Sequence, residues 1–256
     1  MKRRALRLLD PLLQSAPAAR LVDAVVRLWT SAASRMPPAQ GLSRMLELDA
    51  ELQRRIDVLS IELDGGTHPK HRLTGYHDFF VERIRPGESV LDVGSGKSEL
   101  AHDLAVRAGA RVTGLDFNRS RVEHARSRFR ANGLEFVEGD ALDWQPPHAF
   151  DVVVLSNVLE HIAPRVELLR RLGETAQPQR FLIRVPSRER DWLVPLREEL
   201  GLEWISDPTH ETEYTADQLR SELSDAGLEV DEIDQRWGEL WASARRPSTA
   251  SDAASA

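Results

Sequence analysis

The sequence contains no cysteine. This absence excludes disulfide bridges and metal sites built on thiolates, and it is compatible with a reducing compartment, so we expect a cytoplasmic protein. The sequence also lacks any apolar run approaching the roughly 20 residues that a membrane-spanning helix needs. We therefore expect no transmembrane segment.

The chain has no excess of basic charge. Its 34 Lys and Arg residues are outnumbered by 41 Asp and Glu residues, which gives a formal net charge of −7. Such a balance argues against a protein built mainly to bind phosphate backbones, so no nucleic-acid partner is expected. With 256 residues, of which 41% are hydrophobic, the chain can bury the core of one large domain and carry an accessory segment. The oligomeric state is left open.

The most informative segment is 90–98, which reads as a buried strand, a glycine turn and the start of a helix. This arrangement presents backbone N–H groups to a ligand. Two common nucleotide motifs are absent here. A phosphate-binding P-loop needs glycine where Leu91 stands, and a dinucleotide fingerprint needs its third glycine where Glu99 stands. The spacing therefore disfavours both an NTPase and a nicotinamide oxidoreductase.

The remaining pattern in this segment is an acid followed by alternating small residues: Asp92, Gly94, Gly96 and Ser98. It resembles motif I of the class I S-adenosylmethionine (SAM)-dependent methyltransferases. That family usually has a third glycine at the position of Ser98, and serine is small enough to keep the turn.

Three later strands end in polar residues with the order and spacing of the same family. The strand at 111–117 carries Asp116 about 20 residues past the glycine turn, where a carboxylate accepts hydrogen bonds from ribose hydroxyls. The strand at 134–140 ends in Asp140, which the resemblance assigns to the adenine amino group. The strand at 150–157 leads into an Asn-Val-Leu-Glu-His run, which in the family lies beside the transferable methyl group.

The resemblance implies SAM as the cofactor. The residues that it and the turn chemistry assign to cofactor binding are Tyr76, Asp92, Gly94, Ser95, Gly96, Asp116, Phe117, Asp140, Ala141, Ser156 and Asn157.

Strands and helices alternate between these motifs. Alternation predicts an α/β fold with a doubly wound, mostly parallel sheet and helices on both faces. Segments 228–233 and 240–244, around Gly238, look like the closing hairpin that makes seven strands in the resembled family. Right-handed crossovers then bring all the motif loops to the carboxyl edge of the sheet. We expect the methyltransferase domain to span 67–246.

Residues 1–66 are predicted to form a helical extension, interrupted at Met36-Pro37-Pro38 and closed near Gly65. Its basic, leucine-rich start, 2–13, fits either an accessory helix or weak contact with a membrane surface. In the resembled family such an extension would help to cover the pocket. Residues 247–256 are small and polar, which predicts a disordered tail.

Methyl transfer to a hydroxyl needs a group that removes a proton, and histidine suits this role. His161 follows the fourth strand and His210 follows the insertion after the fifth, so both are candidate catalytic residues; Glu160 and Glu213 are nearby alternatives. A purely structural role is the competing interpretation for each histidine. The long segment 186–208 is either a substrate cover or an extra helix with its own small core.

A bound metal ion is weighed and not expected. Some RNA and quinone methyltransferases carry a Glu-x-x-Glu-His run that holds a divalent ion. This chain has Asn157 in place of the first glutamate, so only part of the ligand set remains.

The sequence thus predicts a SAM-dependent methyltransferase that acts on a small molecule, most simply at oxygen. Two alternatives within the same chemistry are an N-methyltransferase of a sugar or metabolite and an RNA methyltransferase. A third alternative is a catalytically silent protein that keeps the SAM fold for binding.

Overall fold

A computed structural model describes residues 16–247 of the chain. The described residues divide into two compact units, and each is considered by itself. One contains the residues up to His68 together with Pro195–Trp204. The other contains Pro69–Val194 and the residues from Ile205 onward.

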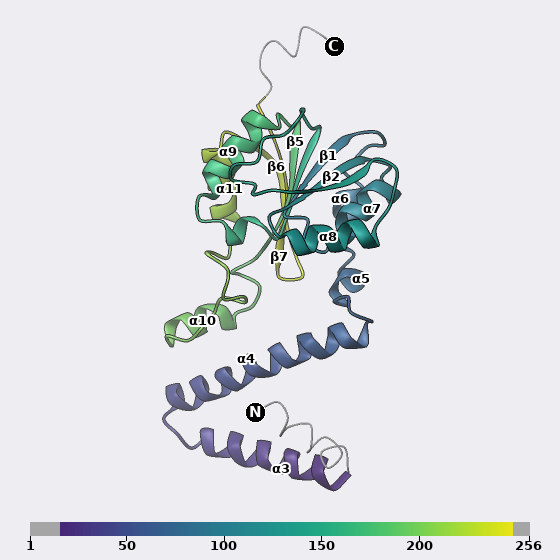
Figure 1. Ribbon diagram of the computed structural model, residues 1–256. Coiled ribbons are helices and arrows are strands. Elements are labelled where there is room, and N and C mark those ends of the chain that lie inside the picture. The colour runs from purple at the N-terminus through teal and green to yellow at the C-terminus, as the bar shows by residue number, and fades with distance from the viewer. Residues whose placement is uncertain (1–15, 248–256) are drawn as a thin grey trace. The chain divides into compact units, whose positions relative to one another are not determined.

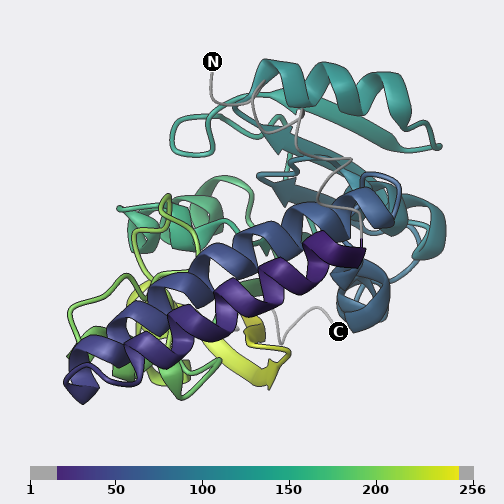
Figure 2. The ribbon, with the colours of Figure 1, turned by 90° about the horizontal axis from the view of Figure 1, so that it is seen from below.

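The first unit is a helical pair. Helix α3 (Ala16–Ala33) and helix α4 (Pro38–Leu63) run side by side, as the purple and blue helices of Figure 2 show. The turn between them contains Pro37, and a proline also occupies the first turn of α4, where its missing N–H costs nothing. Arg197 joins a later segment to α4, because its Nη2 lies 2.7 Å from Oδ2 of Asp49. The expected helical extension is confirmed for the described residues, whereas segment 2–13 lies outside them.

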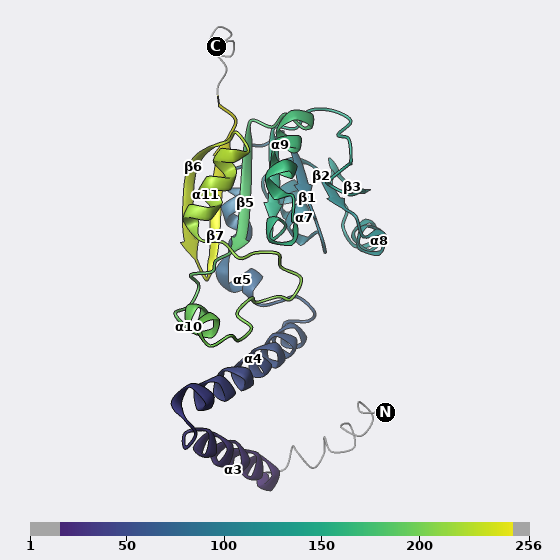
Figure 3. The same cartoon turned by 90° about the vertical axis from the view of Figure 1, so that its left-hand side faces the viewer.

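The second unit is built on a seven-stranded sheet with the order β3-β2-β1-β4-β5-β7-β6 (Figures 1 and 3). Its strands β1 to β5 are mutually parallel, and β7 is antiparallel to both of its neighbours. The expected fold class is confirmed. The strands are β1 (Ser89–Val93), β2 (Arg111–Asp116), β3 (Leu134–Glu138), β4 (Val152–Ser156), β5 (Arg180–Pro186), β6 (Glu229–Arg236) and β7 (Glu239–Arg245).

Helices cover both faces of this sheet and divide its core in two. One apolar cluster joins the sheet to α6, α7 and α8, and the other joins it to α9 and α11 (Figure 1). The central strands are buried on both faces, which explains their almost continuous apolar sequences. The helices are α5 (Lys70–Thr74), α6 (Tyr76–Val81), α7 (Glu99–Arg107), α8 (Arg119–Arg128), α9 (Arg165–Thr175), α10 (Leu193–Glu199), α11 (Ala216–Asp225) and the short 3-10 helix η1 (Leu159–His161).

The closing hairpin turns at Trp237 and Gly238, both of which have positive φ. That geometry is typical of a two-residue turn whose twist matches the flanking strands. The hairpin inserts β7 beside β5, so that Arg184 pairs with Trp241 and Val185 with Leu240. The expected hairpin around Gly238 is therefore confirmed.

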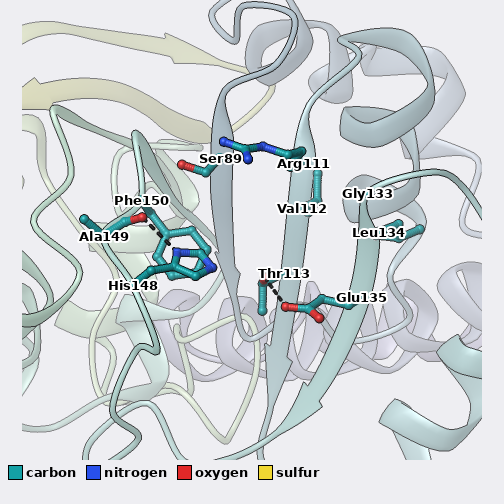
Figure 4. Close-up of a pocket in the computed structure, with 10 residues that line it drawn as sticks. All are labelled: Ser89, Arg111, Val112, Thr113, Gly133, Leu134, Glu135, His148, Ala149 and Phe150. Atoms are coloured by element: carbon teal, nitrogen blue, oxygen red, sulfur yellow. Dashed lines mark hydrogen bonds between the residues drawn. The ribbon is translucent and has the colours of Figure 1, made fainter.

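The stretch between β3 and β4, all of it described, contains no helix. A pocket of about 560 Å³ lies at the amino ends of β1, β2 and β3, beside that connection (Figure 4). Ser89, Arg111 and His148 are among its lining residues, and Thr113 donates a hydrogen bond to Glu135 there. This pocket lies at the edge opposite to the carboxyl ends of the strands. Within 16–247, no helix combines the length and the apolarity needed to cross a bilayer.

Candidate functional site

The turn after β1 is held in a left-handed conformation. Gly94, Gly96 and Ser98 have φ values of 65°, 57° and 66°. A Cβ atom on Gly94 would lie 2.7 Å from Cγ2 of Val158, whereas one on Gly96 would meet nothing closer than an oxygen at 3.8 Å. Glycine is thus required at 94 for space and conformation, and at 96 for conformation. The Ser98 amide donates to the carbonyl of Ser95 at 2.8 Å, which closes the turn.

Asp116, at the end of β2, supports this turn from the neighbouring strand. Its side chain is buried, and its Oδ2 accepts a hydrogen bond from the amide of Gly96 at 2.9 Å. Its Oδ1 accepts one from the amide of Asn118 at 2.8 Å. The predicted Asp116 therefore meets the glycine turn directly. Phe117, the next residue, is 71% exposed.

Asp92 lies at the centre of the same edge and is 2% exposed. Among the described residues, its Oδ2 has no hydrogen-bond partner. Burial, and secondarily the charge of Asp116, raise the pKa of Asp92 to about 7. A carboxyl group with a vacant buried oxygen can accept a hydrogen bond from a polar ligand.

The end of β3 is more open. Asp140 is exposed, and its Oδ1 accepts a hydrogen bond from the amide of Leu142 at 2.9 Å. Ala141 is half-buried, and its carbonyl accepts from Nη1 of Arg171 at 2.9 Å. β3 itself ends at Glu138, so the predicted strand 134–140 is two residues too long and Asp140 lies in a turn.

The end of β4 carries Ser156 and Asn157, both half-buried. Asn157 has a φ of 56°, which directs the chain sharply into η1. Its Oδ1 accepts a hydrogen bond from Nε of Arg184 at 2.8 Å. The guanidinium of Arg184 in turn lies over the ring of Tyr76, 3.6 Å from the centroid. Tyr76, Asn157 and Arg184 therefore form one contiguous group that joins α6, β4 and β5.

Beyond Asn157, the structure brings both predicted histidines together. The rings of His161 and His210 lie 4.7 Å apart in an edge-on arrangement. Amides of the 210–214 segment bond back to the same edge, since Glu211 N–H donates to the carbonyl of Glu160 at 2.7 Å. The link between η1 and the segment after the insertion is therefore made by the backbone.

Hydrogen bonds determine the proton positions on both histidines. Nδ1 of His161 lies 3.2 Å from the carbonyl oxygen of Thr209 and 3.1 Å from its hydroxyl oxygen. Because that hydroxyl donates its proton to Asp207, both oxygens accept, and we assign the proton to Nδ1. Nδ1 of His210 lies 3.3 Å from Oε1 of the buried Glu213. In the neutral form, each ring then keeps its lone pair on Nε2. Burial, and secondarily the neighbouring His161, lower the pKa of His210.

Glu213 is fixed by several donors. Its Oε1 accepts from the amide and the hydroxyl of Ser206, both at 2.6 Å, and its Oε2 is paired with Arg190. A fully bonded carboxylate behind an imidazole is the arrangement that orients a histidine for proton transfer.

The neighbouring Glu160 is completely buried. Within the described part of the chain, neither of its carboxyl oxygens has a hydrogen-bond partner. Burial raises the pKa of Glu160 to about 8, against the opposing charge of Arg184. Burial therefore favours the protonated form of Glu160.

Comparison with known proteins decides the family. Residues 67–233 match the model of a family described as "Methyltransferase domain". The chain belongs to the class I SAM-dependent methyltransferase family. This methyltransferase is 31% identical, over 138 residues, to the ubiquinone biosynthesis O-methyltransferase of Vibrio atlanticus, a match that covers 50% of this chain and 58% of the relative. It is 30% identical over 174 residues to the trans-aconitate 2-methyltransferase of Shigella dysenteriae, covering 61% and 67%. The matched region thus spans little more than half of the first of these relatives.

Solved structures show the same fold at low sequence identity. A methyltransferase from Haloferax volcanii, solved in complex with the activator Trm112, is similar with a TM-score of 0.59 and 20% identity, covering 73% of this chain and 95% of that one. Magnesium protoporphyrin IX methyltransferase from Synechocystis, solved with bound S-adenosylhomocysteine, is similar with a TM-score of 0.55 and 21% identity, covering 68% and 83%.

The residues at the carboxyl edge fit the family's cofactor, SAM. The left-handed turn from Gly94 to Ser98 follows β1 at this edge, and Asp92, whose buried Oδ2 has no partner among the described residues, precedes it on the same strand. We assign the ribose side to Asp116 and the methionine side to the group around Asn157. Phe117, Asp140 and Ala141 flank the adenine side in this assignment, which remains a prediction for each residue.

A divalent ion also has potential ligands here. Glu160, His161 and His210 each offer one ligand atom, and these atoms lie within 4.8 Å of one another. The first position of the Glu-x-x-Glu-His run is Asn157 in this chain, and its amide oxygen already accepts from Arg184.

Sequence reasoning overlooked three residues of this site. Arg184 interrupts the apolar strand Phe-Leu-Ile-Arg-Val, and a lone charge in a buried strand is a usable signal. Val158 packs where a Cβ on Gly94 would lie, which no local pattern reveals. His77, whose Nδ1 lies 2.8 Å from Oδ2 of Asp103, is buried beside Tyr76.

Proposed function

We propose that this methyltransferase transfers the methyl group of SAM to an oxygen atom of a small-molecule acceptor. The observation that carries the proposal is the pair of His210 and Glu213 beside Glu160 and His161, at the carboxyl ends of β4 and β5. A hydroxyl group that receives the methyl must lose its proton, so it needs a base such as this pair. A neutral amine already has a lone pair and depends less on a base. The two curated relatives, which are named for methylation of ubiquinone precursors and of trans-aconitate, support a small oxygen nucleophile.

When bound, SAM would supply a methyl group on a positively charged sulfur. An acceptor oxygen would attack the methyl carbon in line with the carbon–sulfur bond, and the sulfur would leave. The residues of this chain position the acceptor and remove its proton. Glu213 holds the proton of His210 on Nδ1 and leaves Nε2 free to accept. His161 keeps its own Nε2 lone pair through Thr209 and lies against His210, so it either orients the acceptor or replaces His210 as the base.

Substitution of the histidines tests this role. We expect His210→Ala to lower single-turnover methyl transfer by about 10²–10⁴-fold, the usual contribution of a positioned base, while SAM affinity stays nearly unchanged. His161→Ala should lower it less. His124→Ala is the matched control, because His124 is an exposed residue of α8. The acceptor screen would begin with catechols and carboxylic acids.

The alternatives predict different results. Wild-type rates in both histidine variants would indicate an amine acceptor, whose lone pair needs no base. Tight SAM binding with no transfer to any class of acceptor would support the catalytically silent alternative. The net charge of −7 still argues against an RNA substrate. We also infer a cytoplasmic location, in keeping with the absence of cysteine.

A further inference from the structure

Arg184 is a buried cation whose hydrogen bonds are incomplete. It stands near the carboxyl end of β5 and is 4% exposed. Its Nε donates to Asn157, but in the part of the chain that the structure describes its Nη1 has no acceptor. A buried donor left unpaired is destabilising, and more so when the group is charged. An external acceptor would remove that cost.

A second arginine on the same strand shows the contrast. Arg180 also projects from β5, four residues earlier and therefore on the same face. Its Nη1 donates to Glu88 at 3.0 Å, and its Nε and Nη2 both donate to the carbonyl of Arg83. Arg180 is thus satisfied within the protein, at the edge away from the site, whereas Arg184 is not.

The carboxylate beside Arg184 leaves Nη1 without an acceptor among the described residues. The nearest carboxylate is Glu239 on β7, whose Oε2 lies 3.6 Å from Nε, beyond hydrogen-bond distance. That same carboxylate accepts from Nε1 of Trp241 and lies 3.9 Å from Nζ of Lys70. Glu239 therefore has other neighbours besides Arg184.

We propose that Nη1 of Arg184 binds a carboxylate group of a ligand at the carboxyl edge of the sheet. This inference rests on the proposed function, which brings two such ligands to this edge. The carboxylate is either that of the methionine part of the cofactor or one carried by the acceptor. A guanidinium held by Asn157 and stacked on Tyr76 is pre-oriented, so it loses little freedom when the ligand arrives.

One remaining nitrogen matches a carboxylate better than a phosphate. A phosphate dianion presents three oxygens and is usually held by several backbone amides or more than one cation. Nη1 of Arg184, the buried nitrogen without an acceptor in the described residues, offers one such donor.

The test compares two nucleoside ligands that differ in the carboxylate. S-adenosylhomocysteine carries the amino-acid group, and 5′-methylthioadenosine lacks it. If Arg184 holds the cofactor's carboxylate, Arg184→Gln should weaken S-adenosylhomocysteine at least tenfold in calorimetry and leave 5′-methylthioadenosine unchanged. Arg180→Gln, the matched control on the same strand, should leave both affinities unchanged even if it lowers the melting temperature.

A second pair of probes tests the acceptor. If Arg184→Gln leaves S-adenosylhomocysteine binding intact, we expect the protein loaded with this product to bind 3,4-dihydroxybenzoate at least tenfold more tightly than 3,4-dihydroxybenzamide. That preference should disappear in Arg184→Gln. If Arg184→Gln does not fold, Arg184→Lys is used with the same four ligands, and we expect it to show a smaller loss for the carboxylate ligand alone.

The inference and the proposed function fail differently. Unchanged S-adenosylhomocysteine affinity in Arg184→Gln, together with equal binding of the acid and the amide by the wild type, would overturn the role of Arg184 and leave methyl transfer standing. Loss of both nucleosides to the same extent would also overturn it, since the defect would then not concern the carboxylate. A wild-type protein that binds neither nucleoside would overturn the cofactor site itself.

Discussion

Glu213 lies with its Oε1 3.3 Å from Nδ1 of His210, and both side chains are buried against the carboxyl edge of the sheet. The carboxylate fixes one nitrogen of the imidazole as a donor and thereby leaves the other as an acceptor. Burial and the adjacent His161 hold the pKa of His210 below its usual value, whereas Glu213 raises it. His161 and Glu213 therefore shift the pKa of His210 in opposite directions, and substitution of either residue removes one of the two shifts.

We expect Glu213→Gln to lower the pKa of His210 further and to reduce turnover at least tenfold, because an amide can bond to the wrong tautomer. For a base, the rate rises as the histidine loses its proton, so the acid limb of the rate profile should move to lower pH. NMR titration of the imidazole measures the pKa without an acceptor. Glu211→Gln, an exposed neighbour, is the control. An unchanged His210 pKa would show that the two groups are not coupled.

Asp116 should contribute to cofactor affinity through the ribose side. We expect Asp116→Ala to weaken SAM binding by about 1–3 kcal/mol, since it removes an acceptor and frees the amide of Gly96. Calorimetry with SAM measures this, and Asp143→Ala, an exposed acid beyond β3, serves as the control. Full affinity in a folded Asp116→Ala protein would move the ribose contact to another residue.

Gly94 and Gly96 offer a matched pair with similar φ and different surroundings. We expect Gly94→Ala to destabilise the protein by roughly 1–3 kcal/mol, because conformational strain adds to the overlap with Val158. Gly96→Ala should cost only the strain, about 1 kcal/mol. Adding Val158→Ala to Gly94→Ala should recover part of the loss, whereas it should not rescue Gly96→Ala. Urea unfolding of the double-mutant cycle checks this, and strict additivity would refute the contact.

Because of Glu160, the free energy of unfolding should fall as pH rises. A carboxylate paired with a cation has the opposite effect. Its folded pKa of about 8 lies above the ordinary value of 4.5, so between these values the unfolded chain loses a proton that the folded chain keeps. Stability therefore falls as pH rises through this window. Glu160→Gln lacks this penalty. One pKa unit corresponds to about 1.4 kcal/mol, so we expect this variant to be more stable by roughly 1–4 kcal/mol at pH 8.

The comparison at pH 4 is the internal control for Glu160, since both states are then protonated and the two proteins should be similarly stable. Asp92 changes stability in the same direction, but it is present in both proteins and cancels in the difference. Arg184 and Lys70 lower the pKa of Glu160 and Glu239 raises it, so these three residues must stay unaltered. Equal stability of wild type and variant at pH 8 would place the pKa of Glu160 near its ordinary value.

Methyl transfer should not depend on a metal ion. The amide oxygen of Asn157 is occupied by Arg184, and the buried guanidinium repels a divalent cation at the same edge. We expect EDTA to leave the rate unchanged within about twofold. Loss of activity on chelation, with recovery on adding Zn²⁺ or Mn²⁺ and no recovery in a His161→Ala, His210→Ala double variant, would instead show that Glu160 and the two histidines hold an ion.

The sequence was sufficient for the sheet and the glycine turn because their signals are local. Apolar runs ending in Asp92 and Asp116, and the spacing between them, are properties of adjacent residues, and right-handed crossovers then place the ends together. The meeting of His161 with His210 could be expected from the same topology. The end of β3 was placed two residues too late because the strand was extended to the motif residue Asp140, although a turn begins there.

What the sequence could not reveal depends on contacts between distant segments. The unpaired Nη1 of Arg184 depends on the folded chain, in which Asn157, Tyr76 and Glu239 approach from three separate elements and leave this buried nitrogen without an acceptor among the described residues. The raised pKa of Glu160 follows from its complete burial. Nothing in the sequence around this short helix indicates that the side chain is buried. The role of segment 186–208 as a substrate cover, the domain boundaries and the assignment of individual cofactor contacts stay predictions.

The hairpin of β6 and β7 gives the chain an order of assembly during synthesis. β5 carries Arg184, yet its second neighbour in the sheet is β7, which emerges from the ribosome more than 50 residues later. Until residues 239–245 are made, one edge of β5 is unpaired, and Arg184 lacks the nearby charge of Glu239. An unpaired apolar strand is a site for aberrant association, so a nascent or truncated chain that ends before β7 should need a chaperone where the longer chain does not.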